Sequence, residues 1–183
     1  GYNRYTKQTV NIGSAFLQNE WKNEKWSILL GGRLDKHNLI NHVIFSPRAN
    51  LRFNPSEDIN LRLSYSSGFR APQAFDEDLH IENVGGTVSM IERAKNLKEE
   101  KSQSFSASAD MYHRFGAFQV NFLVEGFYTR LSDVFVLENI GERDGILIKE
   151  RRNGSGAKVL GLSMEGKMAY LSLFQLQAGV TLQ

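Results

Sequence analysis

The sequence predicts an all-β protein, an antiparallel meander of about eight long strands that forms part of a larger transmembrane β-barrel. Three observations predict it: apolar residues recur at every second position, the alternating stretches are long, and short connections alternate with wide ones. A strand places successive side chains on opposite faces, whereas a helix would scatter them around its circumference. In residues 45–53, Phe45, Pro47, Ala49, Leu51 and Phe53 share one face, and Ser46, Arg48, Asn50 and Arg52 share the other.

The same alternation divides most of the chain into strands. Several stretches exceed the five or six residues that are typical of strands in soluble proteins. No segment of useful length has helical spacing, and the best candidate, residues 88–101, is polar. The expected strands span residues 9–21, 26–37, 43–53, 59–69, 103–114, 118–138, 146–168 and 173–183.

The connections between these strands differ in length. Short ones are expected at 22–25, 54–58, 115–117 and near 170–172. Wide ones are expected at 38–42, 70–102 and 139–145. Short turns at one end and long loops at the other are typical of outer-membrane barrels, with turns in the periplasm and loops outside the cell.

The alternation alone leaves the environment of each face open. In a membrane barrel the apolar face meets lipid and the polar face lines the lumen, whereas in a soluble sandwich the apolar face is the core. Two alternatives therefore stay open: a soluble β-sandwich binding module, and a self-contained small outer-membrane barrel with a structural or adhesin role. Aromatic residues near strand ends favour the membrane interpretation because barrels carry interfacial aromatic girdles. They are Trp21, Trp26, Tyr65, Phe69, Phe127 and Tyr128.

Composition excludes several classes of protein. The 22 Lys and Arg balance 20 Asp and Glu, a net charge of +2, and no basic stripe points to nucleic acid. The absence of cysteine removes thiol catalysis and Cys-based metal centres. No apolar run reaches the roughly 18–20 residues that a membrane helix needs. No nucleophile elbow, HExxH or phosphate-binding loop is present, so neither an enzyme, nor a cofactor, nor a metal centre is expected.

One segment resembles a known family. Residues 63–72 read LSYSSGFRAP, which closely resembles the "sYgtGFRAP" signature of TonB-dependent receptor barrels, and the continuation QAFDEDLH is similar to the version common in Bacteroidetes. Further segments resemble the family in the same order. They are FLQNEW at 16–21, GRLD at 32–35, SPR at 46–48, FYTRLSD at 127–133 and the approach from Asn153 to Gly161. Ser163 departs from the pattern, since many members carry Glu there.

The resemblance implies an outer-membrane receptor that imports a nutrient such as a siderophore, haem or cobalamin. It implies that residues 1–183 are a partial barrel domain, lacking the plug domain, the TonB box and the closing C-terminal strand, with an extracellular loop at about 70–102. The implied partners are outer-membrane lipid, the receptor's own plug, TonB acting through that plug, and a small-molecule or metal-chelate ligand.

Three groups of residues are candidates for function. Asp76, Asp78, His80 and Glu82 would share a face if extended, and could hold a cation or ligand, although hydrogen bonding within the loop is the simpler interpretation. At the loop base, Gly68, Phe69, Arg70, Ala71 and Pro72 are expected to be structural, with a bend at Gly68 and pairing ended by Pro72. The residues expected to face the lumen and plug are Arg33, Asp35, Arg48, Arg52, Arg62 and Glu165. His37 and His42 could flank a haem, but are more simply polar residues of a hairpin tip.

Overall fold

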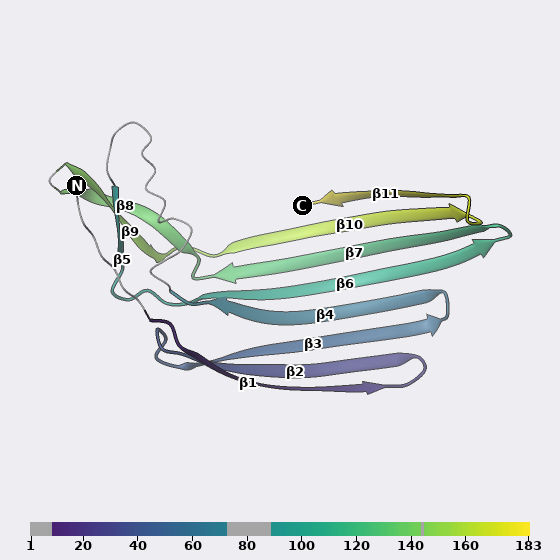
Figure 1. Cartoon of the computed structure of the whole chain (residues 1–183), viewed down its shortest axis with the longest axis horizontal. Coiled ribbons are helices and arrows are strands. Elements are labelled where there is room, and N and C mark those ends of the chain that lie inside the picture. Colours follow the sequence, from purple (N-terminus) through teal and green to yellow (C-terminus); the bar gives the residue numbers. More distant parts are fainter. Residues whose placement is uncertain (1–8, 73–88, 144) are drawn as a thin grey trace.

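A single curved sheet dominates the structure, a computed structural model that describes residues 9–72, 89–143 and 145–183. The sheet has eight strands in the order β1-β2-β3-β4-β6-β7-β10-β11, and every neighbouring pair is antiparallel (Figure 1). The strands are β1 (Ile12–Lys22), β2 (Trp26–His37), β3 (Val43–Ser56), β4 (Ile59–Arg70), β6 (Glu100–Phe115), β7 (Phe118–Ser132), β10 (Ala157–Tyr170) and β11 (Phe174–Leu182). The expected eight-stranded meander is therefore confirmed.

A second, three-stranded sheet was not expected. It contains β5 (Ser89–Arg93), β8 (Phe135–Arg143) and β9 (Ile146–Asn153), with β9 in the middle, antiparallel to β8 and parallel to β5. The predictions of one strand at 118–138 and another at 146–168 were wrong, because each divides into a strand of the large sheet and one of the small sheet. The prediction of a wide connection at 139–145 was also wrong, because this range lies at the hairpin between β8 and β9.

The division occurs where the backbone cannot continue as a strand. Asp133 has a φ of 55°, which turns the chain after β7. Gly156 precedes β10 at a close approach, since a Cβ there would lie 2.1 Å from the Leu131 carbonyl oxygen. Only glycine fits such a contact, and the hydrophobic alternation does not register it.

The two ends of the large sheet differ as expected. At one end, here called the turn end, the chain reverses between β1 and β2, β3 and β4, β6 and β7, and β10 and β11. At the other, the loop end, residues 38–42, 71–99 and 133–156 make the connections, and the last two carry the small sheet (Figure 1). The predicted alternation of short and long connections is confirmed.

The register assigns every strand residue to one of two faces. Across the sheet, Leu30, Ala49, Tyr65, Phe105, Tyr128 and Leu160 stand opposite one another in one row. This face, the apolar face, is uncovered: Leu63 is 54% exposed and Leu160 is 70% exposed. A soluble sandwich would bury such a face against a second sheet, so the sandwich alternative is wrong for this chain.

Aromatic rows mark two levels of the apolar face. Phe105 and Tyr128 stand opposite one another near the loop end of β6 and β7, and Phe115 and Phe118 do so at the turn end. Phe105 and Phe115 are ten positions apart, about 33 Å at the usual rise per residue. A strand tilt of about 40° reduces this to about 25 Å, the height of the apolar band of outer-membrane barrels. Two of the expected girdle residues lie elsewhere, because Phe127 is on the opposite face and Phe69 packs against Ile40, Ile44 and Ala71.

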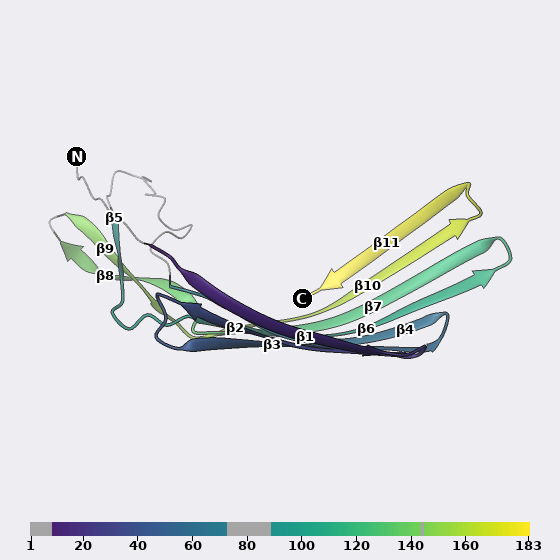
Figure 2. The same cartoon turned by 60° about the horizontal axis from the view of Figure 1, so that its bottom comes forward.

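The sheet is bent along its length rather than closed (Figure 2). Within the described residues, β1 and β11 form its two edges and do not pair with each other, so these eight strands are not a self-contained barrel. No helix among the described residues is long and apolar enough to cross a membrane.

Candidate functional site: the polar face and its rim pocket

The second face of the sheet, the polar face, carries charges of both signs. All six residues expected to face the lumen lie on it by register. They come from four strands: Arg33 and Asp35 from β2, Arg48 and Arg52 from β3, Arg62 from β4 and Glu165 from β10. Their common face is a fact of the structure, and their contact with a plug stays a prediction.

Small hydroxyl groups on the polar face bond sideways between strands. The Oγ atoms of Ser64 and Ser106 are 2.7 Å apart, and Ser104 Oγ lies 3.0 Å from Thr129 Oγ1. Asn121 donates to Asp110 over 2.5 Å. These short side chains use their hydrogen-bonding groups on one another within the sheet. The longer charged side chains are therefore the ones that can reach a domain enclosed by the barrel.

Arginines are concentrated on β3 and β4. Arg52 and Arg62 stand directly opposite one another, and Arg62 Nε donates to Asn60 Oδ1 at 2.7 Å. Neither forms an ion pair with a carboxylate in the described part of the chain. Like charges placed opposite one another destabilise a sheet, so this pair favours an acidic or carbonyl-rich surface opposite it.

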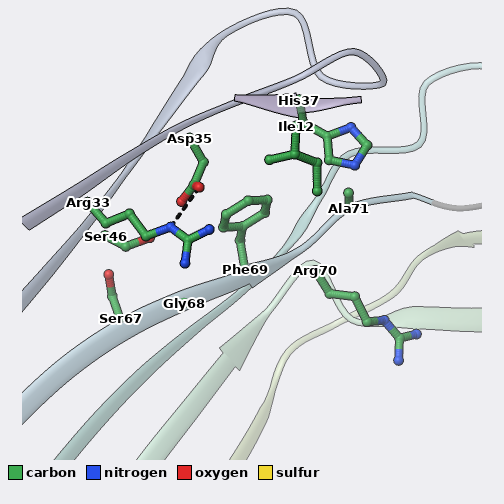
Figure 3. A pocket seen from close by; sticks show the side chains of 10 residues that line it. All are labelled: Ile12, Arg33, Asp35, His37, Ser46, Ser67, Gly68, Phe69, Arg70 and Ala71. Atoms are coloured by element: carbon green, nitrogen blue, oxygen red, sulfur yellow. Dashed lines mark hydrogen bonds and ion pairs between the residues drawn. The ribbon is translucent and has the colours of Figure 1, made fainter. Parts of the chain in front are cut away.

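A pocket of about 400 Å³ lies where the polar face meets the loop end. Figure 3 shows the ten side chains that line it, which come from β1, β2, β3, β4 and the residue that follows β4. They are Ile12, Arg33, Asp35, His37, Ser46, Ser67, Gly68, Phe69, Arg70 and Ala71. The Phe69 ring stands between the Arg33–Asp35 pair and the group formed by Ile12, His37 and Ala71 (Figure 3).

One wall of this rim pocket is a closed ionic network. Arg33 Nε lies 2.8 Å from Asp35 Oδ1, and Ser14 Oγ donates to the same oxygen at 2.5 Å. Arg33 Nη2 also donates to Ser14 Oγ at 3.0 Å. Asp35 is 1% exposed, whereas the Arg33 side chain is 56% exposed. The carboxylate is thus neutralised within the wall, and the guanidinium is the member of the pair that remains accessible.

His37 supplies a hydrogen-bond donor that has no partner. It is the last residue of β2 and begins the turn to Ile40, as expected of a hairpin residue, but it is 1% exposed rather than open to solvent. The Leu39 N–H donates to Nδ1 at 3.0 Å, which in the neutral ring leaves the proton on Nε2. Nε2 is buried and has no hydrogen-bond partner among the described residues. A buried donor left unpaired costs about 1–3 kcal/mol, so the pocket favours an incoming oxygen acceptor.

The loop-base residues pack and bond at the end of β4. Arg70 Nε lies 2.8 Å from Glu100 Oε2, and the guanidinium stacks 5.0 Å from the centre of the Phe135 ring. Glu100 Oε1 also accepts from the Phe135 N–H at 2.6 Å, joining β4, β6 and β8. Gly68 stays within β4, where an added Cβ would lie 3.2 Å from Ser102 Oγ. Pro72 is buried just beyond the strand end.

A second cluster connects the 38–42 loop to the start of β6. Glu99 is 4% exposed and binds His42 Nε2 at 3.1 Å and Lys101 Nζ at 3.1 Å. Burial raises the pKa of Glu99, but a backbone hydrogen bond, the Lys101 ammonium and His42 together outweigh it and hold this pKa below its ordinary value. The loop is therefore held to the barrel wall by an ionised carboxylate.

The acidic cluster Asp76, Asp78, His80 and Glu82 lies outside the described residues. Among the residues that are described, no three His, Asp or Glu side chains gather in a way that could hold a metal ion. The suggestion that His37 and His42 flank a haem gains no support, because His42 Nε2 binds Glu99 and Nδ1 of His37 accepts from the Leu39 N–H.

Long antiparallel strands, an uncovered apolar face, a charged opposite face and loops gathered at one end define the wall of an outer-membrane β-barrel. The whole chain agrees with this class, since residues 1–182 match the family described as TonB dependent receptor-like, beta-barrel. The chain belongs to this family, whose members are transporters rather than enzymes.

Comparison with curated proteins finds no match. Among solved structures, the chain is similar to the siderophore receptor PirA from Pseudomonas aeruginosa, with a TM-score of 0.70 and 16% identity over 94% of this chain. It is similar to a mutant of the ferric enterobactin receptor PfeA from the same organism, in complex with enterobactin, with a TM-score of 0.68 and 17% identity over 95% of the chain. It also resembles the FrpB iron transporter from Neisseria meningitidis, with a TM-score of 0.63 and 16% identity over 94%.

The chain covers only 36%, 27% and 25% of those three structures. At these identities the likeness shows a shared fold, so activity and ligand are matters of proposal.

Proposed function

We propose that this chain is part of the wall of a receptor that imports an oxygen-rich metal chelate of the ferric siderophore type. The polar face would enclose a plug domain, and TonB would act through that plug. The arginines of β3 and β4 support this arrangement, because Arg52 and Arg62 face each other and neither has a carboxylate partner in the ranges that the structure describes. A plug surface rich in carboxylates and carbonyls would relieve that repulsion.

The observation that carries the ligand class is the chemistry of the rim pocket. The pocket presents a buried Nε2–H from His37, an accessible guanidinium from Arg33 and the hydroxyls of Ser46 and Ser67. The one carboxylate among its described lining residues, Asp35, is already bonded to Arg33 and Ser14. Such a pocket accepts oxygen atoms, and siderophores present oxygen atoms around a ferric ion. The siderophore receptors among the similar structures agree with this choice.

Growth assays test the proposal. A strain lacking the full-length receptor is grown with a ferric siderophore, haem, cobalamin or an oligosaccharide as the limiting nutrient. We expect a defect on the ferric siderophore, and normal growth there with a defect on any of the others would overturn the ligand class.

A point variant connects growth to the pocket. His37→Phe removes the Nε2–H donor and keeps a ring, and we expect siderophore affinity to fall about 10-fold, as for one lost buried hydrogen bond. The matched control is His113→Phe, because His113 lies at the turn end, on the apolar face. Equal siderophore affinities of the two variants would show that the pocket does not bind the ligand.

A further inference from the structure

Formal charges on the apolar face of the large sheet are few, all positive and all near the loop end. The register places Lys36, Lys101, Arg130 and Lys158 on this face, and within the described strands it places no Asp or Glu there. The polar face, by contrast, mixes both signs along its whole height. This asymmetry indicates that the apolar face meets anions at one level only.

Arg130 and Lys158 form an unrelieved pair. They stand directly opposite one another on β7 and β10, and both are exposed. The other two cations have partners, since Lys101 binds Glu99 and Lys36 Nζ donates to the carbonyls of Ile40 and Asn41. Within the part of the chain that the structure describes, neither Arg130 nor Lys158 forms an ion pair or hydrogen bond through its side chain. Two like charges at this spacing destabilise the sheet until an anion sits between them.

An apolar groove begins one row below that pair. It has a volume of about 700 Å³ and crosses the sheet from β2 to β10. Tyr128 and Leu160 bound it nearest the cations, and Ala107 and Gly126 lie one row further toward the turn end. A Cβ added at Gly126 would meet nothing within 4 Å, so this part of the wall is hollow.

The cation pair and the groove lie close enough along the strands for one molecule to contact both. Rows of the same face are two residues apart, about 7 Å along a strand. A headgroup held at Arg130 and Lys158 would therefore place its acyl chain directly into the groove. The loop end faces the cell exterior in barrels of this kind, which assigns the site to the outer leaflet.

We propose that Arg130, Lys158 and the groove bind one outer-leaflet lipid that carries an anionic phosphate headgroup and acyl chains. The guanidinium binds phosphate through paired hydrogen bonds, the ammonium adds a point charge, and one acyl chain lies against Ala107 and Gly126. The inference concerns the outer surface of the wall, so it stands or falls independently of the imported ligand.

The test uses the full-length receptor in zwitterionic detergent and bisphosphorylated lipid A as the probe. With about 1 kcal/mol from each basic residue near a charged membrane surface, Arg130→Gln with Lys158→Gln should weaken binding about 30-fold. Gly126→Leu should weaken binding by filling the groove while leaving both cations in place. Lys36→Gln, which removes a cation of the same face that already has partners, should bind as the unaltered receptor does.

Two further arms separate the sources of phosphate. A zwitterionic phosphatidylcholine of the same chain length should bind more weakly than lipid A, and inorganic phosphate should leave the thermal midpoint unchanged. If inorganic phosphate saturated the site at the same concentration as lipid A, the groove would have no role in binding. Without lipid, the double variant should be at least as stable as the unaltered receptor because like charges are gone. A loss of stability there, or unchanged lipid binding, would overturn the proposal.

Discussion

A single arginine placed on either face of β7 tests the assignment of the two faces. Val124 lies on the apolar face, four positions from Tyr128 and six from Phe118. At about 3.3 Å per residue and a tilt of about 40°, it lies roughly 10 Å from one aromatic row and 15 Å from the other. Val124→Arg therefore puts a guanidinium close to the middle of the bilayer. We expect a loss of about 2–4 kcal/mol in the free energy of unfolding.

The adjacent residue provides the control. Leu123 lies on the polar face, opposite Asp110 on β6 and Glu165 on β10. Leu123→Arg introduces the same side chain between two carboxylates, where an opposite-charge pair contributes about 0.2–1 kcal/mol in favour of folding. Denaturant unfolding of the full-length receptor in lipid vesicles, followed by tryptophan fluorescence, measures both changes. Equal destabilisation by the two arginines would refute the lipid-facing assignment.

Three further predictions address local features of the wall. Gly161→Val should lower unfolding stability by about 1–3 kcal/mol because its Cβ would lie 2.3 Å from the Phe127 ring, whereas Gly166→Val, with nothing within 4 Å, should be close to neutral by the same denaturant assay. Glu100→Gln should weaken the bonds to Arg70 and to the Phe135 N–H, so hydrogen exchange at the start of β8 should quicken, and an unchanged rate would contradict the loop-base role. The lowered pKa of Glu99 stabilises the rim when the carboxylate is ionised, and that contribution is lost as pH falls below 4.5, so acid should lower the protection of the amides in residues 38–42, measured against their intrinsic exchange rates at each pH, in the unaltered receptor but not in Glu99→Gln.

The large sheet could be predicted because its signal is repeated many times. Residues 45–53 alternate without exception, and each strand of the sheet repeats the pattern, so lipid on one side and a polar interior on the other impose one period throughout. The residues expected on the polar face lie there for the same reason. A single residue such as Arg62 is placed by its neighbours in sequence, since Leu61 and Leu63 require the opposite face.

The small sheet and the rim pocket depend on information that the alternation lacks. Residues 135–143 and 146–153 continue the β pattern, and the departure from the large sheet rests on the backbone at Asp133 and Gly156. His37 appeared to belong to a polar hairpin tip because its sequence neighbours are polar. Ile12, which stands opposite it on β1, and Ala71, which lines the same pocket, come from other parts of the chain. Close approaches of this kind are set by tertiary packing, which a two-residue period does not encode.

The distribution of charge also explains why the register is unique. Because the side-chain period is two, a slip of β7 by one residue would turn Glu125 and Asn121 toward the acyl chains and Phe122 and Val124 toward the interior. The same slip would move Arg130 off the apolar face, where it stands opposite Lys158. The exchanges at Glu125, Asn121, Phe122 and Val124 place a charge or a polar group in lipid and apolar groups against polar neighbours, and these penalties act on the same strand together. The apolar face can therefore carry its cations only at the level where the bilayer itself becomes polar, which is the level they occupy.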